Sequence, residues 1–155
     1  MHSDNYQQNA PTELRQILET AANMLAVKYA RSGTFTNPEA TKQYLQMKLA
    51  HYDKEVFGVM FLDTQHRLIE FKEMFFGTLD AASVYPREVV KAALERNAGA
   101  VIFAHNHPSG IPEPSQADRK ITQRLSEALG LIDIKVLDHI VVGEQCVSFA
   151  ERGLI

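Results

Sequence analysis

The sequence predicts an α/β or α+β domain with a mostly antiparallel sheet. Three observations support this fold class: helical periodicity in the first third of the chain, a hairpin pattern after Glu55, and short apolar segments that alternate with helical patterns from there onward. The composition is that of a globular domain, with 45% hydrophobic and 23% charged residues. A chain of 155 residues fits one domain and can bury a core without disulfide bonds.

Two helices are expected before the sheet. Apolar residues recur at three- and four-residue steps over residues 12–32. Asn37 and Pro38 then resemble an N-cap and a proline at the first helical position, which predicts a second helix ending near residue 51. Together they form a predicted N-terminal helical segment, residues 1–52, that is either a small subdomain or the flank of a single core.

The predicted sheet lies within residues 53–155. An apolar, partly β-branched run at 56–62, a turn, and a second strand at 67–76 indicate a hairpin. The elements expected after it are a helix at 86–97, a strand at 100–104, a helix at 115–129, strands at 132–137 and 139–142, and a short strand at 147–149.

Charge and cysteine content narrow the function classes. The net charge is -3, with a pI near 6.1, so no overall positive field attracts nucleic acid, and only a local basic patch would do so. Cys146 is the only cysteine, which excludes an intrachain disulfide and suits a reducing compartment. The N-terminal residues lack signal-peptide features, and no apolar run approaches the roughly 20 residues of a membrane span. We therefore expect a cytoplasmic protein with no membrane partner.

His105 and His107 are the first part of a candidate metal site. They lie two residues apart at the end of a predicted strand, so both imidazoles project from one face. Asp118 follows in the first turn of the next helix, after a loop whose three prolines and one glycine let it fold back sharply. Two histidines and a carboxylate are a standard ligand set for catalytic zinc, with water in the fourth position.

Hydrolysis at such a site also needs a general base. Zinc lowers the pKa of its bound water to about 7 and polarises the scissile carbonyl, and a nearby side chain must take the proton. Glu55, at the start of the first expected strand, is the candidate, although spacing alone does not place it beside the metal.

Each feature also has a simpler explanation. A His-x-His pair at a strand end is more often incidental than a metal site. Ser115 and Asp118 also form a helix-start signal, in which the serine caps the helix and the aspartate is favoured by the helix dipole. Glu55 alone is consistent with a solvated strand-end charge. His139 either supports a metal-ligating histidine or is a structural residue in an apolar segment.

The joint spacing resembles a known motif. His105-x-His107, seven residues, Ser115, two residues and Asp118 match, without a gap, the JAMM motif of the JAB/MPN metalloprotease superfamily. The run that starts at His105, His-Asn-His-Pro-Ser-Gly, is similar to that of its bacterial RadC branch, and supporting similarity covers residues 55–154.

This resemblance implies a fold and a ligand set. The fold would be a cytidine-deaminase-like α/β sandwich over residues 53–155, in which a curved, mixed sheet carries flanking helices. Short RadC-like proteins carry a stretch similar to residues 12–52 as well. Within the motif, the residues that match His105, His107 and Asp118 bind Zn2+.

The resemblance also implies catalytic roles. Ser115 would hydrogen-bond the tetrahedral oxyanion, and Glu55, followed by Gly58 in a Glu-x-x-Gly element, would be the general base. The expected function is a zinc-dependent metallohydrolase, a peptidase or isopeptidase acting on a peptide or protein substrate that the resemblance does not identify.

The main alternative is a DNA-repair-associated accessory protein that binds DNA or a repair partner, with structural zinc. The acidic pI argues against tight DNA binding. Longer RadC proteins carry an N-terminal helix-hairpin-helix module, and the residues before Glu55 show no glycine-containing hairpin of that type. A zinc deaminase would need a Cys-x-x-Cys pair, which a single cysteine excludes.

Overall fold

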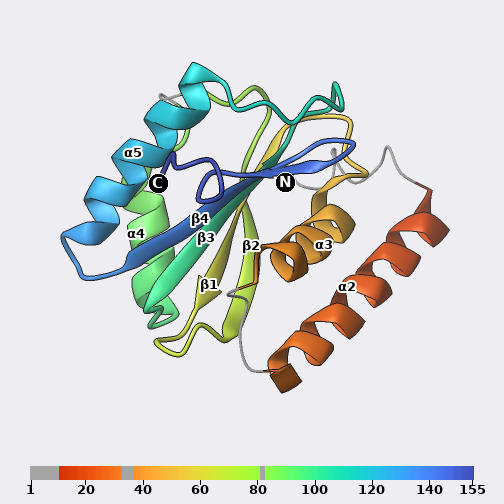
Figure 1. The fold of residues 1–155 in the computed structure, drawn as a ribbon, viewed down its shortest axis with the longest axis horizontal. Coiled ribbons are helices and arrows are strands. Elements are labelled where there is room, and N and C mark those ends of the chain that lie inside the picture. The colour runs from red at the N-terminus through yellow and green to blue at the C-terminus, as the bar shows by residue number, and fades with distance from the viewer. Residues whose placement is uncertain (1–10, 33–36, 81–82) are drawn as a thin grey trace.

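A computed structural model describes residues 11–32, 37–80 and 83–155 (Figure 1). The order of elements along these residues is α2 (Thr12–Ser32), α3 (Pro38–Leu49), β1 (Val56–Leu62), β2 (Leu68–Phe76), α4 (Pro86–Glu95), β3 (Ala100–Asn106), α5 (Gln116–Gly130), β4 (Lys135–Val142) and β5 (Cys146–Ser148).

The strands form one mixed sheet in the order β2-β1-β3-β4-β5. Strands β3 and β4 are parallel, and the other neighbouring pairs are antiparallel. The predicted α/β fold class with a mixed, mostly antiparallel sheet and flanking helices is therefore confirmed.

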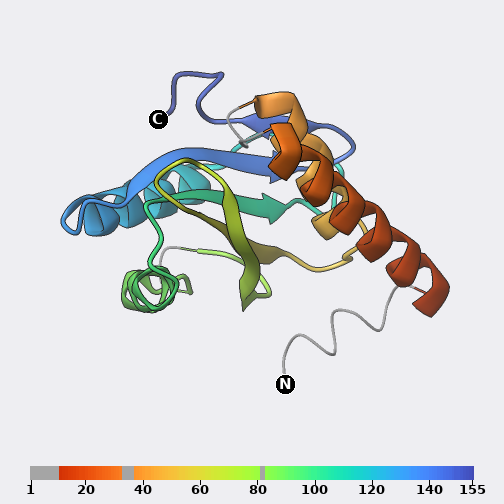
Figure 2. The ribbon, with the colours of Figure 1, turned by 90° about the horizontal axis from the view of Figure 1, so that it is seen from below.

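Helices cover both faces of the sheet (Figures 1 and 2). One core cluster lies between the sheet and α4 with α5, and the other lies between the sheet and α3 with α2. Every residue of β1 and β3 is buried, which explains why both strands are apolar runs rather than alternating patterns.

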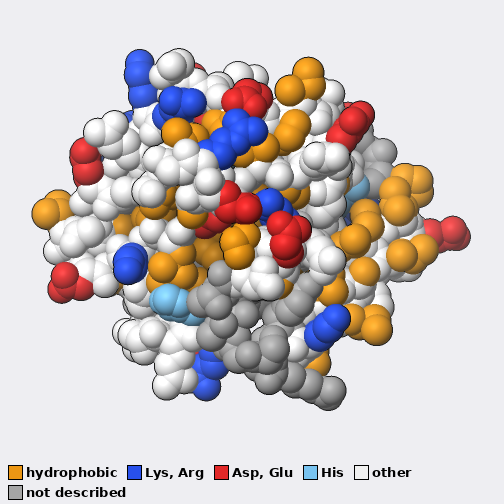
Figure 3. Space-filling model, viewed as in Figure 1, with side chains coloured by type: hydrophobic (Ala, Val, Ile, Leu, Met, Phe, Trp, Pro, Cys, Tyr) orange, Lys and Arg blue, Asp and Glu red, His pale blue; other side chains and the backbone are white. Residues whose placement is uncertain are grey.

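Helix α3 is the flank of the main core. Tyr44, Leu45 and Leu49 belong to the cluster that includes sheet residues. Helix α2 packs on α3 instead, and its outer side exposes apolar side chains such as Ile17 and Met24. Figure 3 shows hydrophobic side chains gathered over the region of α2. The domain division at residue 53 stays a prediction.

The two strands predicted at 132–137 and 139–142 are wrong, because β4 is a single strand. The gap left between them is Asp138, whose side chain accepts hydrogen bonds from the Ser148 hydroxyl at 2.6 Å and the Ala150 N–H at 2.9 Å. A buried carboxyl with such donors can stay inside a strand. Elsewhere the predicted elements agree with the structure to within a few residues.

Among the helices of the described residues, none combines the length and apolar character that crossing a membrane would require.

Candidate metal centre

The candidate ligands lie where β3 ends and α5 begins. His105 is the next-to-last residue of β3. The His107 N–H donates to the Val142 carbonyl at 2.8 Å, which holds His107 beside β4. The loop then turns back through Gly110, whose φ of 86° favours glycine. This return brings Asp118, in the first turn of α5, to the two histidines, as the loop composition predicted.

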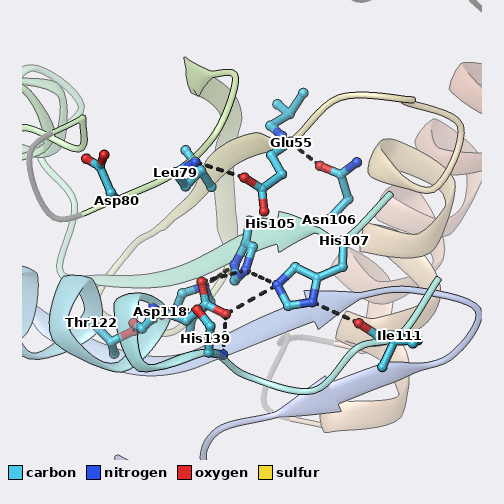
Figure 4. Close-up of polar contacts among 12 residues, drawn as sticks. Glu55, Leu79, Asp80, His105, Asn106, His107, Ile111, Asp118, Thr122 and His139 are labelled. Carbon is cyan, nitrogen blue, oxygen red and sulfur yellow. Dashed lines mark hydrogen bonds and ion pairs between the residues drawn. The ribbon is translucent and has the colours of Figure 1, made fainter. Parts of the chain in front are cut away.

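The three side chains converge on one point (Figure 4). His105 Nε2 and His107 Nε2 are 3.0 Å apart. Asp118 Oδ1 lies 3.1 Å from His105 Nε2, and Asp118 Oδ2 lies 3.2 Å from His107 Nε2. Tetrahedral zinc with bonds of about 2.0 Å separates its ligand atoms by about 3.3 Å, so this cluster could hold such an ion with little adjustment.

The cluster is shielded from water. The side chains of His105 and Asp118 are 1% and 5% exposed, whereas that of His107 is 14% exposed. Burial raises the pKa of Asp118, but the close approach of the two histidines outweighs this effect and holds the pKa well below its usual range. The hydrogen bond to Asp118 in turn raises the pKa of His107. The site therefore keeps a carboxylate charge and favours a cation beside it.

Each histidine is oriented through its other ring nitrogen. His107 Nδ1 lies 2.8 Å from the Ile111 carbonyl oxygen, and His105 Nδ1 lies 2.7 Å from His139 Nε2. His139 thus contacts a candidate ligand directly, which favours its supporting role over a purely structural one. Burial lowers the pKa of His139 well below its usual value, and the charge of nearby His105 lowers it further.

Glu55 opens onto the same cleft as the cluster. A cleft of about 450 Å³ is lined by Glu55, His107 and Ser115, among others. One carboxylate oxygen of Glu55 accepts a hydrogen bond from the Leu79 N–H at 2.8 Å, and Figure 4 shows the carboxylate pointing toward the histidines. Glu55 therefore lies beside the candidate ligands, which its position in the sequence could not establish. Its role as the general base stays a prediction.

Ser115 and Asp118 also form the capping box of α5. Ser115 Oγ accepts from the Asp118 N–H at 3.1 Å, and Asp118 Oδ2 accepts from the Ser115 N–H at 2.7 Å. The helix-start explanation is therefore correct, and it holds together with the metal-site geometry. Since the serine oxygen is an acceptor in the cap, its own proton remains for donation.

Asn106 was not predicted to belong to the site. Its side chain is buried, with Oδ1 accepting from the Val56 N–H at 2.7 Å and Nδ2 donating to the Lys54 carbonyl at 2.9 Å. These bonds fix the backbone on both sides of Glu55. The available signal was a polar residue between two histidines at the end of a predicted strand, which must face the side opposite to theirs.

The mixed sheet and the His-His-Asp cluster beside the end of its central strand define the class of this protein: an α/β domain with a candidate metal centre. The sequence profile of the family described as "RadC-like JAB domain" matches residues 35–154, and the chain belongs to this family.

Close relatives carry the name "UPF0758 protein". One from Vibrio cholerae serotype O1 is 61% identical over 151 residues, which cover 97% of this chain and 96% of the relative. A second from the same organism is 67% identical over 138 residues, covering 89% of this chain and 87% of the relative. A protein of Methylibium petroleiphilum is 58% identical over 144 residues, but the match covers only 65% of that longer protein.

Proposed function

We propose that this protein is a zinc-dependent hydrolase of amide bonds, a peptidase or isopeptidase acting on peptide or protein substrates. The observation that carries the proposal is the shared cleft: His107 of the candidate cluster, Glu55 and Ser115 line one opening. Membership of the RadC-like JAB family is consistent with it.

His105, His107 and Asp118 would hold the ion. Two imidazole nitrogens and one carboxylate oxygen are donors that suit Zn2+. When bound, zinc supplies a Lewis acid that polarises a carbonyl and lowers the pKa of water to about 7.

Glu55 is the proton acceptor in this proposal. Its carboxylate faces the cleft because the Leu79 N–H holds one oxygen and the Asn106 side chain holds the neighbouring backbone. A carboxylate fixed in this way can take a proton on one side of the cleft and return it to a leaving amine.

Ser115 is the oxyanion donor. Its hydroxyl stands at the N-terminus of α5, where the helix dipole favours negative charge, and its proton is not used by the capping box.

The metal is tested first. Protein purified without chelator is expected to contain about one zinc per chain, measured by inductively coupled plasma mass spectrometry. Substoichiometric zinc in folded protein that also fails to take up added zinc would contradict the metal assignment.

Activity is tested next, with a metal-replete screen of peptide libraries and ubiquitin-like conjugates. Glu55→Gln is expected to keep its zinc and lose turnover, whereas Glu88→Gln, at a half-buried glutamate of α4 that pairs with Lys91, is the matched control and should retain both. Equal turnover by the wild type and Glu55→Gln would remove Glu55 as the base.

A further inference from the structure

Behind His105, two buried side chains continue a chain of hydrogen bonds into the core (Figure 4). We propose that Thr122 and His139 are positioning residues that fix the tautomer of His105, so that its Nε2 carries a lone pair toward the metal position. This inference rests on the metal site of the proposed function and does not depend on which bond the protein hydrolyses.

This series of hydrogen bonds begins at Asp118 and ends at His105, both candidate ligands. Thr122 Oγ1 lies 2.7 Å from the backbone carbonyl oxygen of Asp118 and 2.6 Å from His139 Nδ1. His139 Nε2 lies 2.7 Å from His105 Nδ1. Thr122, His139 and His105 are between 1% and 3% exposed, so water is not an alternative partner for these atoms.

The positions of the protons follow from the single hydroxyl of Thr122. A carbonyl oxygen cannot donate, so the contact to the Asp118 carbonyl uses the hydroxyl proton of Thr122. The threonine oxygen must then accept a hydrogen bond from His139 Nδ1–H. A neutral imidazole with a proton on Nδ1 has a bare Nε2, which accepts from His105 Nδ1–H. His105 Nε2 is therefore left unprotonated.

His107 reaches the same state by a shorter route. Its Nδ1 faces the Ile111 carbonyl at 2.8 Å, and a carbonyl partner requires Nδ1 to carry the proton. Both Nε2 atoms thus face the Asp118 carboxylate with lone pairs, which is the arrangement that a cation needs. With the hydroxyl of Thr122 turned toward His139 instead, every proton of the chain would shift, and His105 Nε2 would be blocked.

Packing keeps the His139 ring in place. It stacks on Phe149, with ring centroids 4.6 Å apart, and meets the edges or faces of Phe57 and Phe103 at 5.7 and 5.9 Å. Aromatic rings pack on several sides of the imidazole, and within the described residues its ring nitrogens contact only Thr122 and His105.

The test compares two variants of Thr122 with one control variant, all in the full chain. Thr122→Val keeps the shape of the side chain and removes the hydroxyl, Thr122→Ser keeps the hydroxyl, and Thr20→Val, on the exposed side of α2, is the matched control. Long-range 1H–15N spectra of the metal-free protein, recorded about two pH units above the ordinary histidine pKa, report the tautomer of each histidine. Zinc affinity is measured separately by competition with a chelator.

The wild type is expected to show His105 and His139 protonated on Nδ1. Thr122→Val should move the proton of both rings to Nε2 and weaken zinc binding by about 10- to 100-fold, the effect typical of a lost partner behind a metal-ligating histidine. Thr122→Ser and Thr20→Val should keep the wild-type tautomers and affinity. Since valine could prevent folding, Thr122→Ala is a second variant with the same expectation.

The inference is overturned when His105 of the wild type carries its proton on Nε2, or when folded Thr122→Val and Thr122→Ala keep wild-type tautomers and affinity. Failure of the proposed function looks different. Protein that takes up no zinc would contradict the hydrolase proposal, while the tautomers of the metal-free protein would still decide the role of Thr122 and His139.

Discussion

The two faces of the sheet at the end of β3 differ in what they contribute to the site. His105 faces α5 and meets Asp118 and His139, whereas its neighbour Asn106 faces α3 and binds the backbone on either side of Glu55. Alternation along a strand produces this division from consecutive residues. One face gathers the candidate ligands, and the other positions the candidate base.

We therefore expect metal binding and the positioning of Glu55 to be separable. A change on the His105 face should remove the metal and spare the backbone near Glu55. A change on the Asn106 face should move Glu55 and spare the ligands. Four experiments test this separation.

The largest effect is expected from His107→Ala. It removes one of three candidate ligand atoms and leaves the buried Asp118 carboxylate with only His105 and the Ser115 N–H as partners. Zinc content should fall from about one ion per chain to near zero, measured by mass spectrometry. His66→Asn, in the β1–β2 turn, is the control, because asparagine tolerates the positive φ of 62° found there. Retention of stoichiometric zinc by His107→Ala would contradict the assignment of His107 as a ligand.

Asn106→Ala should act on stability and turnover instead. It leaves the Val56 N–H and the Lys54 carbonyl without their present partner, and each buried unsatisfied group costs about 1–3 kcal/mol. The free energy of unfolding should fall by about 2–3 kcal/mol in urea titrations. The folded protein should keep its zinc while turnover drops, because Glu55 loses its fixed backbone. Parallel loss of zinc and turnover would show that the faces are not independent.

The pH dependence of zinc affinity tests the ligand side alone, because it depends on the protonation of His107. The hydrogen bond to Asp118 raises the pKa of His107 above the ordinary 6.5 in the metal-free protein, and zinc requires the neutral imidazole. Affinity should be constant above that raised pKa and fall by about tenfold per pH unit below it, where one proton competes with the ion. Competition titrations across a pH series measure this slope. A flat profile down to the ordinary histidine pKa would contradict the coupling of His107 and Asp118.

The smallest effect is expected far from both faces. Met24 on α2 is 68% exposed, so Met24→Gln should change the free energy of unfolding by less than about 0.5 kcal/mol. Zinc content and turnover should stay at wild-type values. A larger loss of stability in urea titrations would indicate that the outer face of α2 is covered in solution.

The convergence of the three candidate ligands could be predicted because their geometry is local. His105 and His107 share a face by strand alternation, and a stiff loop returns Asp118 within one short stretch of chain. The approach of Glu55 depends on the antiparallel pairing of β1 with β3, in which Phe57 lies opposite His105. That register joins segments about 50 residues apart, so the resemblance to a family indicated it and spacing did not.

Partners of buried polar groups were harder to predict for the same reason. Asn106 binds a segment about 50 residues before it, and Asp138 binds Ser148 across the β4–β5 turn. Thr122 is an ordinary helical residue in the sequence, and only the packing of α5 against β4 brings it to His139. The pattern of apolar residues places strands and helices, but it does not show which polar atoms will meet.

The capping box of α5 gives one carboxylate two tasks. Asp118 Oδ2 accepts the Ser115 N–H and also faces His107, so the first helical turn and the metal position are held by the same atom. An ion bound there would stabilise the N-terminal turn of α5. Local opening of that turn would become rarer with metal present, and amide hydrogen exchange over residues 116–119 would slow in step with metal occupancy.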